Sequence, residues 1–418
     1  MKHPWNPRLS ADDVGTHVRT LLAAGHTDAV LVHDLDRLRS SLAALTDAFP
    51  AQTLHAVAIK ANPLVGVLKA VVESGAHLGL EAASIEEVHL ALAAGCAPGR
   101  IVYDSPAKTR EELAEALHLG VRLNADNREE LERIAALQPG LSSVIGVRVN
   151  PAVGAGAIET TSVASPSSRF GVSIEQVPGL LADFGFLRGL HVHVGSQGSP
   201  LEQLVEGVGR VVRLADDFGD RITTLDIGGG LPTSYRSDVE PPSPYVYAAA
   251  LRAALPGLFD GRREVVTEFG RALLAGCGFA LSPVEYVKAI SSGGAAPPVP
   301  TAVIRLGADL LLRPAYRPQE WKHEFLAFDA LGQPRTGPQV HTKVAGPLCF
   351  AGDVIGDTQL PVVQPGDFIA IRDTGAYTMG MWSRHCSRGM PRVLGLEGGH
   401  IRTLRQRETP ADIVRFWS

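Results

Sequence analysis

Eight short apolar runs with polar or small residues at their ends recur between residues 54 and 268 of this 418-residue chain. Amphipathic segments such as SIEEVHLALAAG and REELAEALHLG lie between most of them and carry apolar residues at helical spacing. The runs end at residues 60, 81, 104, 126, 150, 196, 228 and 268. Eight strand-then-helix units predict an α/β fold, a TIM-like (β/α)8 barrel, whose active site lies at the carboxyl ends of the strands. Lys60, Glu81, His193, Gly228 and Glu268 would then meet on one face.

The pattern changes near residue 285, where the segment SSGGAAPPVP begins. Short runs rich in Val and Ile follow, separated by Gly and Pro, which is typical of an all-β domain. We therefore expect a barrel over residues 29–284 and a C-terminal β domain over residues 285–418. Residues 1–28 precede the barrel pattern, and we expect them to pack on the β domain.

Charge and composition exclude several classes of partner. The net charge is −5 and 6% of residues are aromatic, so neither nucleic acid nor an anionic membrane is an expected partner. No run approaches about 18 consecutive apolar residues, and the start MKHPWNPRLSADD lacks the apolar core of a signal peptide. We expect a cytoplasmic protein.

The four cysteines are scattered and show no CxxC spacing, which fits a reducing compartment. Cys96 and Cys277 stand among small residues, which predicts packing thiols. Cys349, in the loop-like GPLCFAGD, is the better candidate for chemistry.

Lys60 ends the apolar run LHAVAIK, where a lysine must be solvated, paired or used covalently. Burial disfavours an ammonium ion and leaves a nucleophilic amine, which reacts with aldehydes such as pyridoxal phosphate. The ordinary alternative is a lysine that extends from the strand end to water.

Three consecutive glycines, Gly228 to Gly230, follow the seventh run, and Gly270 and Arg271 follow the eighth. A bare GGG is more often a tight turn, but barrels commonly bind phosphate on the loops after strands seven and eight. Backbone N–H groups beside an arginine suit a phosphate group.

Two further residues suit a pyridine ring near that phosphate. Glu268, at the end of the eighth run, could pair with a protonated ring nitrogen, and His193 could lie flat against the ring. His191 and His193 could instead form an H-x-H metal pair. No third ligand stands at convincing spacing, so we expect no metal.

Six motifs then occur in order: AVAIKANP, HVHVGSQ, LDIGGG, EFGR, GPLCFAGD and DTGAYT. Together they resemble the fold-type III pyridoxal-phosphate decarboxylases, which include diaminopimelate and ornithine decarboxylases, over roughly residues 28–395. The resemblance implies an alanine racemase-like barrel joined to a β domain, with pyridoxal phosphate as cofactor and an amino acid as substrate. It also implies a head-to-tail homodimer whose β domains complete the shared active sites.

The resemblance assigns a role to individual residues. Lys60 resembles the Schiff-base lysine, Glu268 the partner of the pyridine nitrogen, and His193 the ring-stacking histidine. Cys349 resembles the cysteine that crosses the dimer interface to protonate the carbanion left by CO2 loss. Glu81 stands near the ring, where the family usually has aspartate. The implied cofactor contacts also include Ser196, Gly228, Gly229, Gly230, Gly270, Arg271 and Tyr377, and the implied intersubunit ion pair joins Arg169 to Asp353.

Substrate choice is where the chain departs from the pattern. Phe350 follows the cysteine, where these decarboxylases carry an acid that binds a distal ammonium, and Arg305 stands where aspartate is common. A buried ammonium without an anionic partner is costly. The substrate-binding set that we expect is Arg271, Arg313, Tyr316, Phe350 and Tyr377.

We therefore expect an amino-acid decarboxylase that is not a standard diaminopimelate enzyme. Its substrate would carry a distal carboxylate or amide, or an apolar or enlarged side chain. An amino acid attached to a carrier or to another acid is a further possible substrate. Two alternatives are a racemase, which would need a tyrosine opposite Lys60, and a non-catalytic regulator. The loop over residues 152–168 is either a lid or an idle surface loop.

Overall fold

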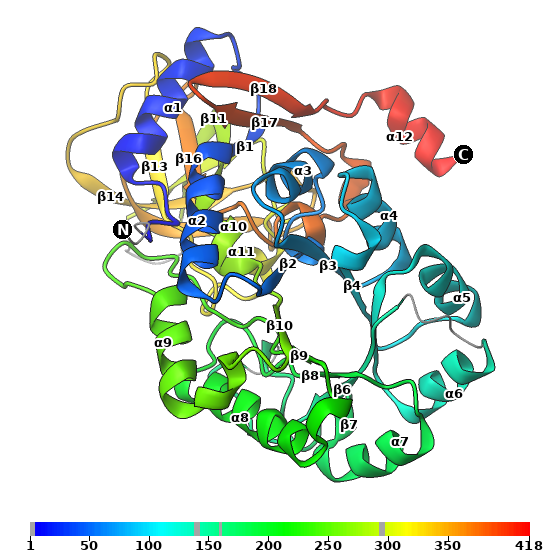
Figure 1. Ribbon diagram of the computed structural model, residues 1–418. Coiled ribbons are helices and arrows are strands. Elements are labelled where there is room, and N and C mark those ends of the chain that lie inside the picture. The colour runs from blue at the N-terminus through cyan, green and yellow to red at the C-terminus, as the bar shows by residue number, and fades with distance from the viewer. Residues whose placement is uncertain (1–4, 138–142, 159–160, 292–296) are drawn as a thin grey trace. The chain divides into compact units, whose positions relative to one another are not determined.

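The computed structural model describes residues 5–137, 143–158, 161–291 and 297–418, which form two compact units (Figure 1). The barrel unit contains residues 39–233 and 241–273 together with Trp5, and the β unit contains residues 6–38, 234–240 and 274–418. The chain thus enters the β unit three times, whereas the sequence pattern placed boundaries near residues 28 and 284.

Eight parallel strands close into the predicted barrel. They are β2 (Leu54–Ala58), β3 (Leu78–Ala82), β4 (Ile101–Asp104), β5 (Arg122–Ala125), β6 (Ile145–Asn150), β8 (Gly189–His191), β9 (Thr224–Asp226) and β10 (Glu264–Thr267). The ring closes because β10 pairs with β2 and β5 pairs with β6, and a short β7 (Val172–Ser173) pairs with β6 alone. All eight runs identified in the sequence form these strands, so the barrel prediction is confirmed.

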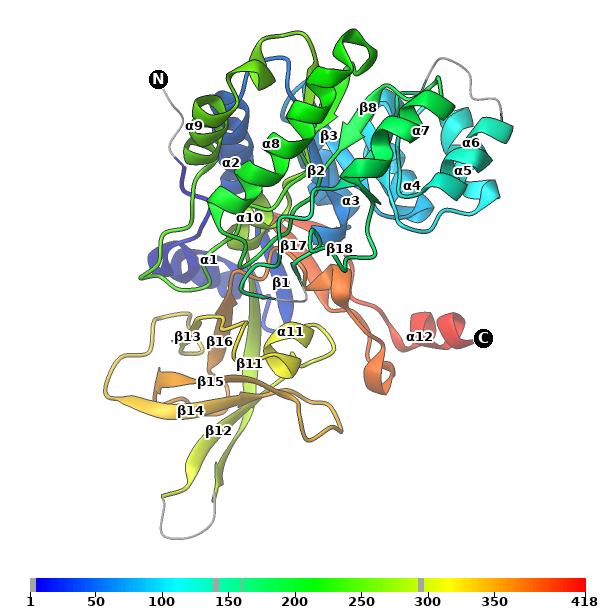
Figure 2. The same cartoon turned by 90° about the horizontal axis from the view of Figure 1, so that it is seen from below.

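Helices lie around the outside of the strands, as Figure 2 shows. They are α2 (Leu35–Ala48), α3 (Val65–Glu73), α4 (Ile85–Ala93), α5 (Arg110–Leu119), α6 (Arg128–Ala136), α7 (Val177–Asp183), α8 (Leu201–Asp217) and α9 (Pro244–Ala254), and a short, buried α10 (Arg271–Leu274) follows β10. The sequence fixes several of their ends: Thr109 and Glu112 form a capping box on α5, and Gly120 ends it with a left-handed φ of 76°.

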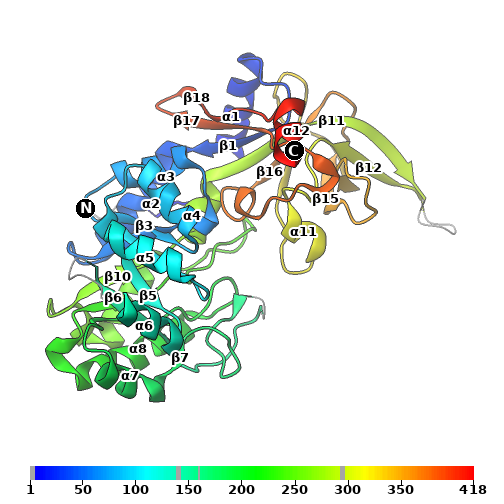
Figure 3. The ribbon, with the colours of Figure 1, turned by 90° about the vertical axis from the view of Figure 1, so that its right-hand side faces the viewer.

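The β unit is built on a second sheet. Its strands are β1 (Val30–Asp34), β11 (Gly278–Ile290), β12 (Val299–Ile304), β13 (Phe325–Phe328), β14 (Gln339–Ala345), β15 (Val354–Pro361), β16 (Phe368–Arg372), β17 (Arg392–Glu397) and β18 (His400–Arg405). Helices α1 (Ala11–Ala23), α11 (Leu312–Tyr316) and α12 (Pro410–Trp417) complete the unit. Figure 3 shows β11 and β12 running side by side as a long antiparallel ribbon.

The N-terminal helix α1 contributes to the core of this second unit. Val14, Val18 and Leu21 of α1 are fully buried and belong to one hydrophobic cluster with strand residues such as Val32 and Phe279. The strand β1 pairs with both β11 and β17, so residues 6–38 contribute a helix and a strand to a unit formed mostly by the C-terminal third of the chain.

Within the part of the chain that the structure describes, no helix is long and apolar enough to cross a membrane. The cellular location stays a prediction.

Candidate active site

Lys60 is paired with a buried carboxylate. It follows β2, and its Nζ donates to both carboxylate oxygens of Glu81 at 2.6 Å. Strand register explains the contact, because Ala58 of β2 lies opposite Glu81 of β3. The Glu81 side chain is fully buried, whereas 39% of the Lys60 side chain is exposed. Burial raises the pKa of Glu81 and the Lys60 ammonium opposes that shift. Lys60 is thus both paired and accessible.

Glu268 follows β10, and its carboxyl group is 1% exposed. Its Oε1 has no hydrogen-bond partner among the described residues. Burial, reinforced by Glu81 and Asp104, raises the pKa of Glu268 well above its ordinary value. Because buried polar atoms are nearly always paired, this oxygen suits a ligand with a hydrogen-bond donor.

His193 lies beside Glu268 with its Nδ1 3.9 Å from Glu268 Oε2. The same Nδ1 accepts a hydrogen bond from the Gly229 N–H at 3.2 Å. Burial, then the charges of Arg148 and Lys60, lower the pKa of His193 well below its ordinary value, so the imidazole is neutral. A neutral ring is free to stack on an aromatic cofactor.

The three glycines after β9 have no room for side chains. A Cβ on Gly228 or Gly229 would collide with backbone oxygens, and one on Gly230 would lie 2.9 Å from Leu204 Cδ2. Gly228 and Gly230 also have positive φ angles, 64° and 116°. This packing explains the glycines by itself, and the phosphate site stays a prediction.

The loops after β8 and β10 supply the remaining residues that the sequence analysis selected in the barrel. Ser196 is partly buried after β8. Gly270 packs tightly, because a Cβ there would lie 2.9 Å from Ala61 Cβ. Arg271 is 3% exposed and begins α10. Each therefore lies at the carboxyl end of the strands, as Lys60 and Glu268 do.

The β unit carries an aromatic group next to the exposed Cys349. The rings of Tyr316 and Phe350 stack with centroids 5.7 Å apart and planes 19° apart. His385 meets Phe350 edge-on at 6.1 Å. Tyr316 is 58% exposed and Phe350 37% exposed, so both rings have surface available for another molecule.

Arg313 lies between two aromatic rings of the same unit. Its guanidinium carbon is 4.4 Å from the Trp321 centroid and 4.7 Å from the Tyr377 centroid. Arg305, by contrast, forms ion pairs with Asp28 and Glu285 and lies at the surface. Cation–π contacts on both sides hold the Arg313 guanidinium in place.

Asp353 anchors the Cys349 loop from within. One carboxylate oxygen accepts the Ala308 N–H at 2.6 Å and the other accepts the Leu348 N–H at 2.7 Å. In the barrel unit, Arg169 is exposed and lies over the Phe170 ring at 4.3 Å. The intersubunit ion pair of Arg169 with Asp353 stays a prediction.

Sequence reasoning missed a buried polar layer behind Glu268. Asp104 ends β4, Arg148 lies in β6 and Asp226 ends β9, and all three are buried. His191 is fully buried among them and was weighed only as a metal ligand. The position of each of these residues, within or at the end of a barrel strand, was visible in the sequence. The alternation of side chains along a strand does not by itself show which of them point into the barrel.

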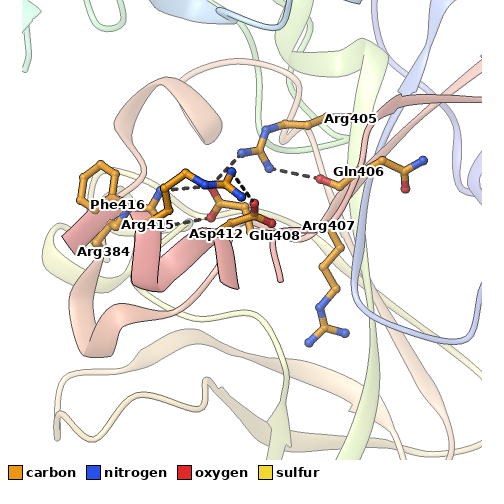
Figure 4. Close-up of a pocket in the computed structure, with 8 residues that line it drawn as sticks. All are labelled: Arg384, Arg405, Gln406, Arg407, Glu408, Asp412, Arg415 and Phe416. Atoms are coloured by element: carbon orange, nitrogen blue, oxygen red, sulfur yellow. Dashed lines mark hydrogen bonds and ion pairs between the residues drawn. The ribbon is translucent and has the colours of Figure 1, made fainter. Parts of the chain in front are cut away.

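A hollow of about 550 Å³ lies in the β unit beside α12 (Figure 4). Four arginines and two acids line it, and the acids pair with three of the arginines. Arg384 and Arg405 both pair with Glu408 at 3.0 Å, and Arg415 pairs with Asp412. None of the motifs found in the sequence contributes to it, so we do not place the chemistry there.

Comparison with known proteins decides the family. Residues 35–275 match the pyridoxal-dependent decarboxylase, pyridoxal binding domain. The chain belongs to the pyridoxal-dependent decarboxylases. It is 31% identical to diaminopimelate decarboxylase of Pseudomonas aeruginosa over 85% of this chain and 84% of that protein. The enzyme of the same name from Methanothermobacter thermautotrophicus is 32% identical over 86% and 83%.

A solved structure agrees along nearly the whole chain. Diaminopimelate decarboxylase from Helicobacter pylori, complexed with L-lysine, superposes with a TM-score of 0.83 at 28% identity, covering 95% of this chain and 98% of that one. The barrel with a separate β domain is therefore the family fold. The chain is a fold-type III amino-acid decarboxylase and its cofactor is pyridoxal phosphate.

The residues present fit that cofactor. An accessible lysine amine meets the need for a covalent anchor, and the unpartnered Glu268 Oε1 meets the need for an acceptor at a protonated ring nitrogen. The N–H groups of Gly228 and Gly229 donate to Asp226 and His193, so the role of the glycine loop at the phosphate group stays a prediction.

Gly229→Ala tests the glycine loop. The new Cβ would collide with the Glu268 carbonyl oxygen, so Glu268 or the loop must shift. Such overpacking costs about 1–3 kcal/mol of folding free energy. We expect the dissociation constant for pyridoxal phosphate, measured by fluorescence quenching, to rise about tenfold or more. Gly179→Ala, in α7 where nothing lies within 4 Å of the new Cβ, is the control and should bind the cofactor normally. Unchanged binding in Gly229→Ala would remove the loop from the cofactor site.

Proposed function

We propose that this enzyme decarboxylates an amino acid with an apolar or aromatic side chain, in a homodimer where Cys349 of one subunit serves the Lys60 site of the other. The stacked Tyr316 and Phe350 rings beside Cys349 carry the substrate part of the proposal. Family membership and the Lys60–Glu81 pair support decarboxylation at Lys60, and the resemblance of the GPLCFAGD motif supports the role of Cys349.

Bound pyridoxal phosphate supplies the electron sink for the pair of electrons left when the α-carboxylate departs as CO2. Lys60 would hold the cofactor through its side-chain amine. Glu268 would accept a hydrogen bond from a protonated ring nitrogen at its unpartnered Oε1, and the neutral His193 would pack against the ring. The C–C bond to the carboxylate breaks, and a proton on the Cys349 sulfur forms the new C–H bond.

The substrate's distal end decides specificity. A distal ammonium gains affinity where a carboxylate replaces its water, and loses it where only apolar groups do. Phe350 offers no negative charge, and its ring neighbours Tyr316 and His385 form an aromatic surface instead. Aromatic and apolar side chains gain by covering these rings.

The Arg313 contacts favour an apolar substrate over a carboxylate-bearing one. Its guanidinium already lies between Trp321 and Tyr377, so its charge is partly satisfied by the two rings. A racemase or a silent regulator is the weaker proposal, because the family is one of decarboxylases and this chain keeps Lys60, Glu268 and Cys349 together with the motifs around them.

A panel of amino acids tests the substrate class. We expect the highest kcat/KM for CO2 release with aromatic or large apolar amino acids, and a lower value with meso-diaminopimelate. Phe350→Glu should shift preference toward substrates with a distal ammonium by about tenfold or more, since it adds an anionic partner. Phe350→Leu, which adds no charge, is the matched control, and Lys60→Ala is the blank.

Fast turnover of meso-diaminopimelate by the unmodified enzyme, above all other substrates, would contradict the proposed specificity. Release of CO2 by Lys60→Ala at the unmodified rate would contradict the role of the lysine.

Mixed dimers test the shared site. Lys60→Ala and Cys349→Ala homodimers should each be nearly inactive. If each site takes its lysine and cysteine from different subunits, random reassociation of equal amounts restores about a quarter of the activity, because half the dimers are mixed and each has one intact site. Two variants that share a defect, such as Lys60→Ala with Lys60→Met, should restore nothing. Failure of the first mixture, with exchange shown by mass spectrometry, would place the cysteine within its own subunit's site or outside the chemistry.

A further inference from the structure

His191 lies between two carboxylates in the barrel interior. It belongs to β8 and its side chain is fully buried. Its Nε2 is 3.3 Å from Glu268 Oε2, and its Nδ1 is 3.8 Å from Asp104 Oδ2. Neither ring nitrogen makes a well-aligned hydrogen bond with any described residue. Catalytic hydrogen bonds are often long before ligands bind, so this imidazole stands where a proton can pass.

The two carboxylates differ in charge. Burial opposes ionisation of Asp104, but His191, whenever it carries a proton, and the Arg148 guanidinium outweigh this effect and lower the pKa of Asp104. The Arg148 guanidinium lies 3.3 Å from Asp104 Oδ2. Burial raises the pKa of Glu268 in the opposite direction. Asp104 is therefore the anionic member of the two, and Glu268 is the acid on which burial favours a proton.

This difference sets the tautomer of His191. The anionic Asp104 lies 3.8 Å from Nδ1 and favours a hydrogen on that atom, so the lone pair of a neutral His191 is on Nε2, which faces Glu268 Oε2. His193 cannot fill this role at its Nδ1, because that atom already accepts the Gly229 N–H.

Asp226 is the other acid nearby, and its oxygens are already used. One accepts the Gly228 N–H at 3.0 Å and the other the Asn124 side-chain amide at 3.2 Å. Burial, then Glu268, raise the pKa of Asp226, which favours a proton already on this acid and leaves it a poor acceptor for another. His191 is the neighbour placed to receive the proton.

We propose that His191, backed by Asp104, is a positioning residue that takes the proton from Glu268 Oε2 when the cofactor's ring nitrogen faces Oε1. The Oε2–H bond breaks and an Nε2–H bond forms. The negative charge left on Glu268 then pairs with the protonated ring nitrogen, while the imidazolium is held by Asp104. The inference rests on the cofactor and on Glu268, and it does not depend on the substrate.

A metal ion is the competing explanation of the same three residues. Asp104, His191 and Glu268 each offer one ligand atom, all within 4.8 Å of one another. The two nitrogens of His191 face different carboxylates, and the Arg148 cation lies against Asp104. A second cation beside an arginine is repelled, so a proton fits the site better than a divalent ion.

His191→Gln is the test, since its amide can form hydrogen bonds and cannot take up a proton. The readout is the infrared difference spectrum between cofactor-free protein and protein loaded with pyridoxal phosphate. In the unmodified protein the buried carboxylic-acid band, assigned with Glu268→Gln, should disappear on loading. In His191→Gln the band should persist, and kcat should fall about tenfold or more with little change in KM.

Two controls isolate the effect. His55→Gln changes another buried barrel histidine, which bonds Thr267 at 2.8 Å and whose pKa burial lowers to about 3, so it should leave the infrared change intact. A cofactor analogue with carbon in place of the ring nitrogen should leave the acid band in place. Asp104→Asn serves as the second variant if His191→Gln does not fold, and the band should persist there too.

Three results would overturn the proposal. One is loss of the acid band in folded His191→Gln as in the unmodified protein. Another is no loss of the band in the unmodified protein itself. The third is a stoichiometric divalent metal in the purified protein that Asp104→Asn removes, which would assign the three residues to a metal site. Each readout is independent of which amino acid the enzyme accepts.

Discussion

The structure depends on how the barrel holds acids out of water at the carboxyl ends of its strands. Glu81, Asp104, Asp226 and Glu268 are all buried there, and a buried carboxylate is stable only beside a cation, a donor or its own proton. Glu81 lies beside the Lys60 ammonium, and Asp104 lies beside the Arg148 guanidinium. Asp226 accepts from backbone and amide donors, and burial favours the protonated form of Glu268. The unpartnered oxygen of Glu268 marks the place where we propose that a cationic ring nitrogen is stabilised.

Much of this arrangement is predictable from the sequence, because the spacing of apolar residues in strands and helices can be seen without knowledge of the tertiary structure. Eight alternating units give the barrel, and the polar ends of the strands give Lys60, Glu81 and Glu268. The entry of β1 into the other sheet is not predictable in this way, since a buried five-residue strand looks the same in either unit. Pairing with β11 and β17, far along the chain, decides where it belongs.

The polar layer around His191 shows a second limit. Pairing of β6 with β8 places Arg148 opposite His191, whereas Asp104 comes from β4, which does not pair with β8, and only the curvature of the barrel brings it to the histidine. Pair contacts of this kind carry no local sequence signature. The β unit differs again: the substitution of Phe350 is visible in the sequence, whereas its stacking on Tyr316, from a helix 34 positions earlier, needs the fold.

The central claim is that the accessible lysine paired with Glu81 carries the cofactor. Borohydride reduction of the pyridoxal-phosphate-loaded protein, followed by peptide mass spectrometry, tests it most directly because reduction fixes the carbon–nitrogen bond in place. The account predicts one phosphopyridoxyl group per chain, on the peptide that contains Lys60. A label on another lysine, or none on a protein that retains bound cofactor, would contradict it.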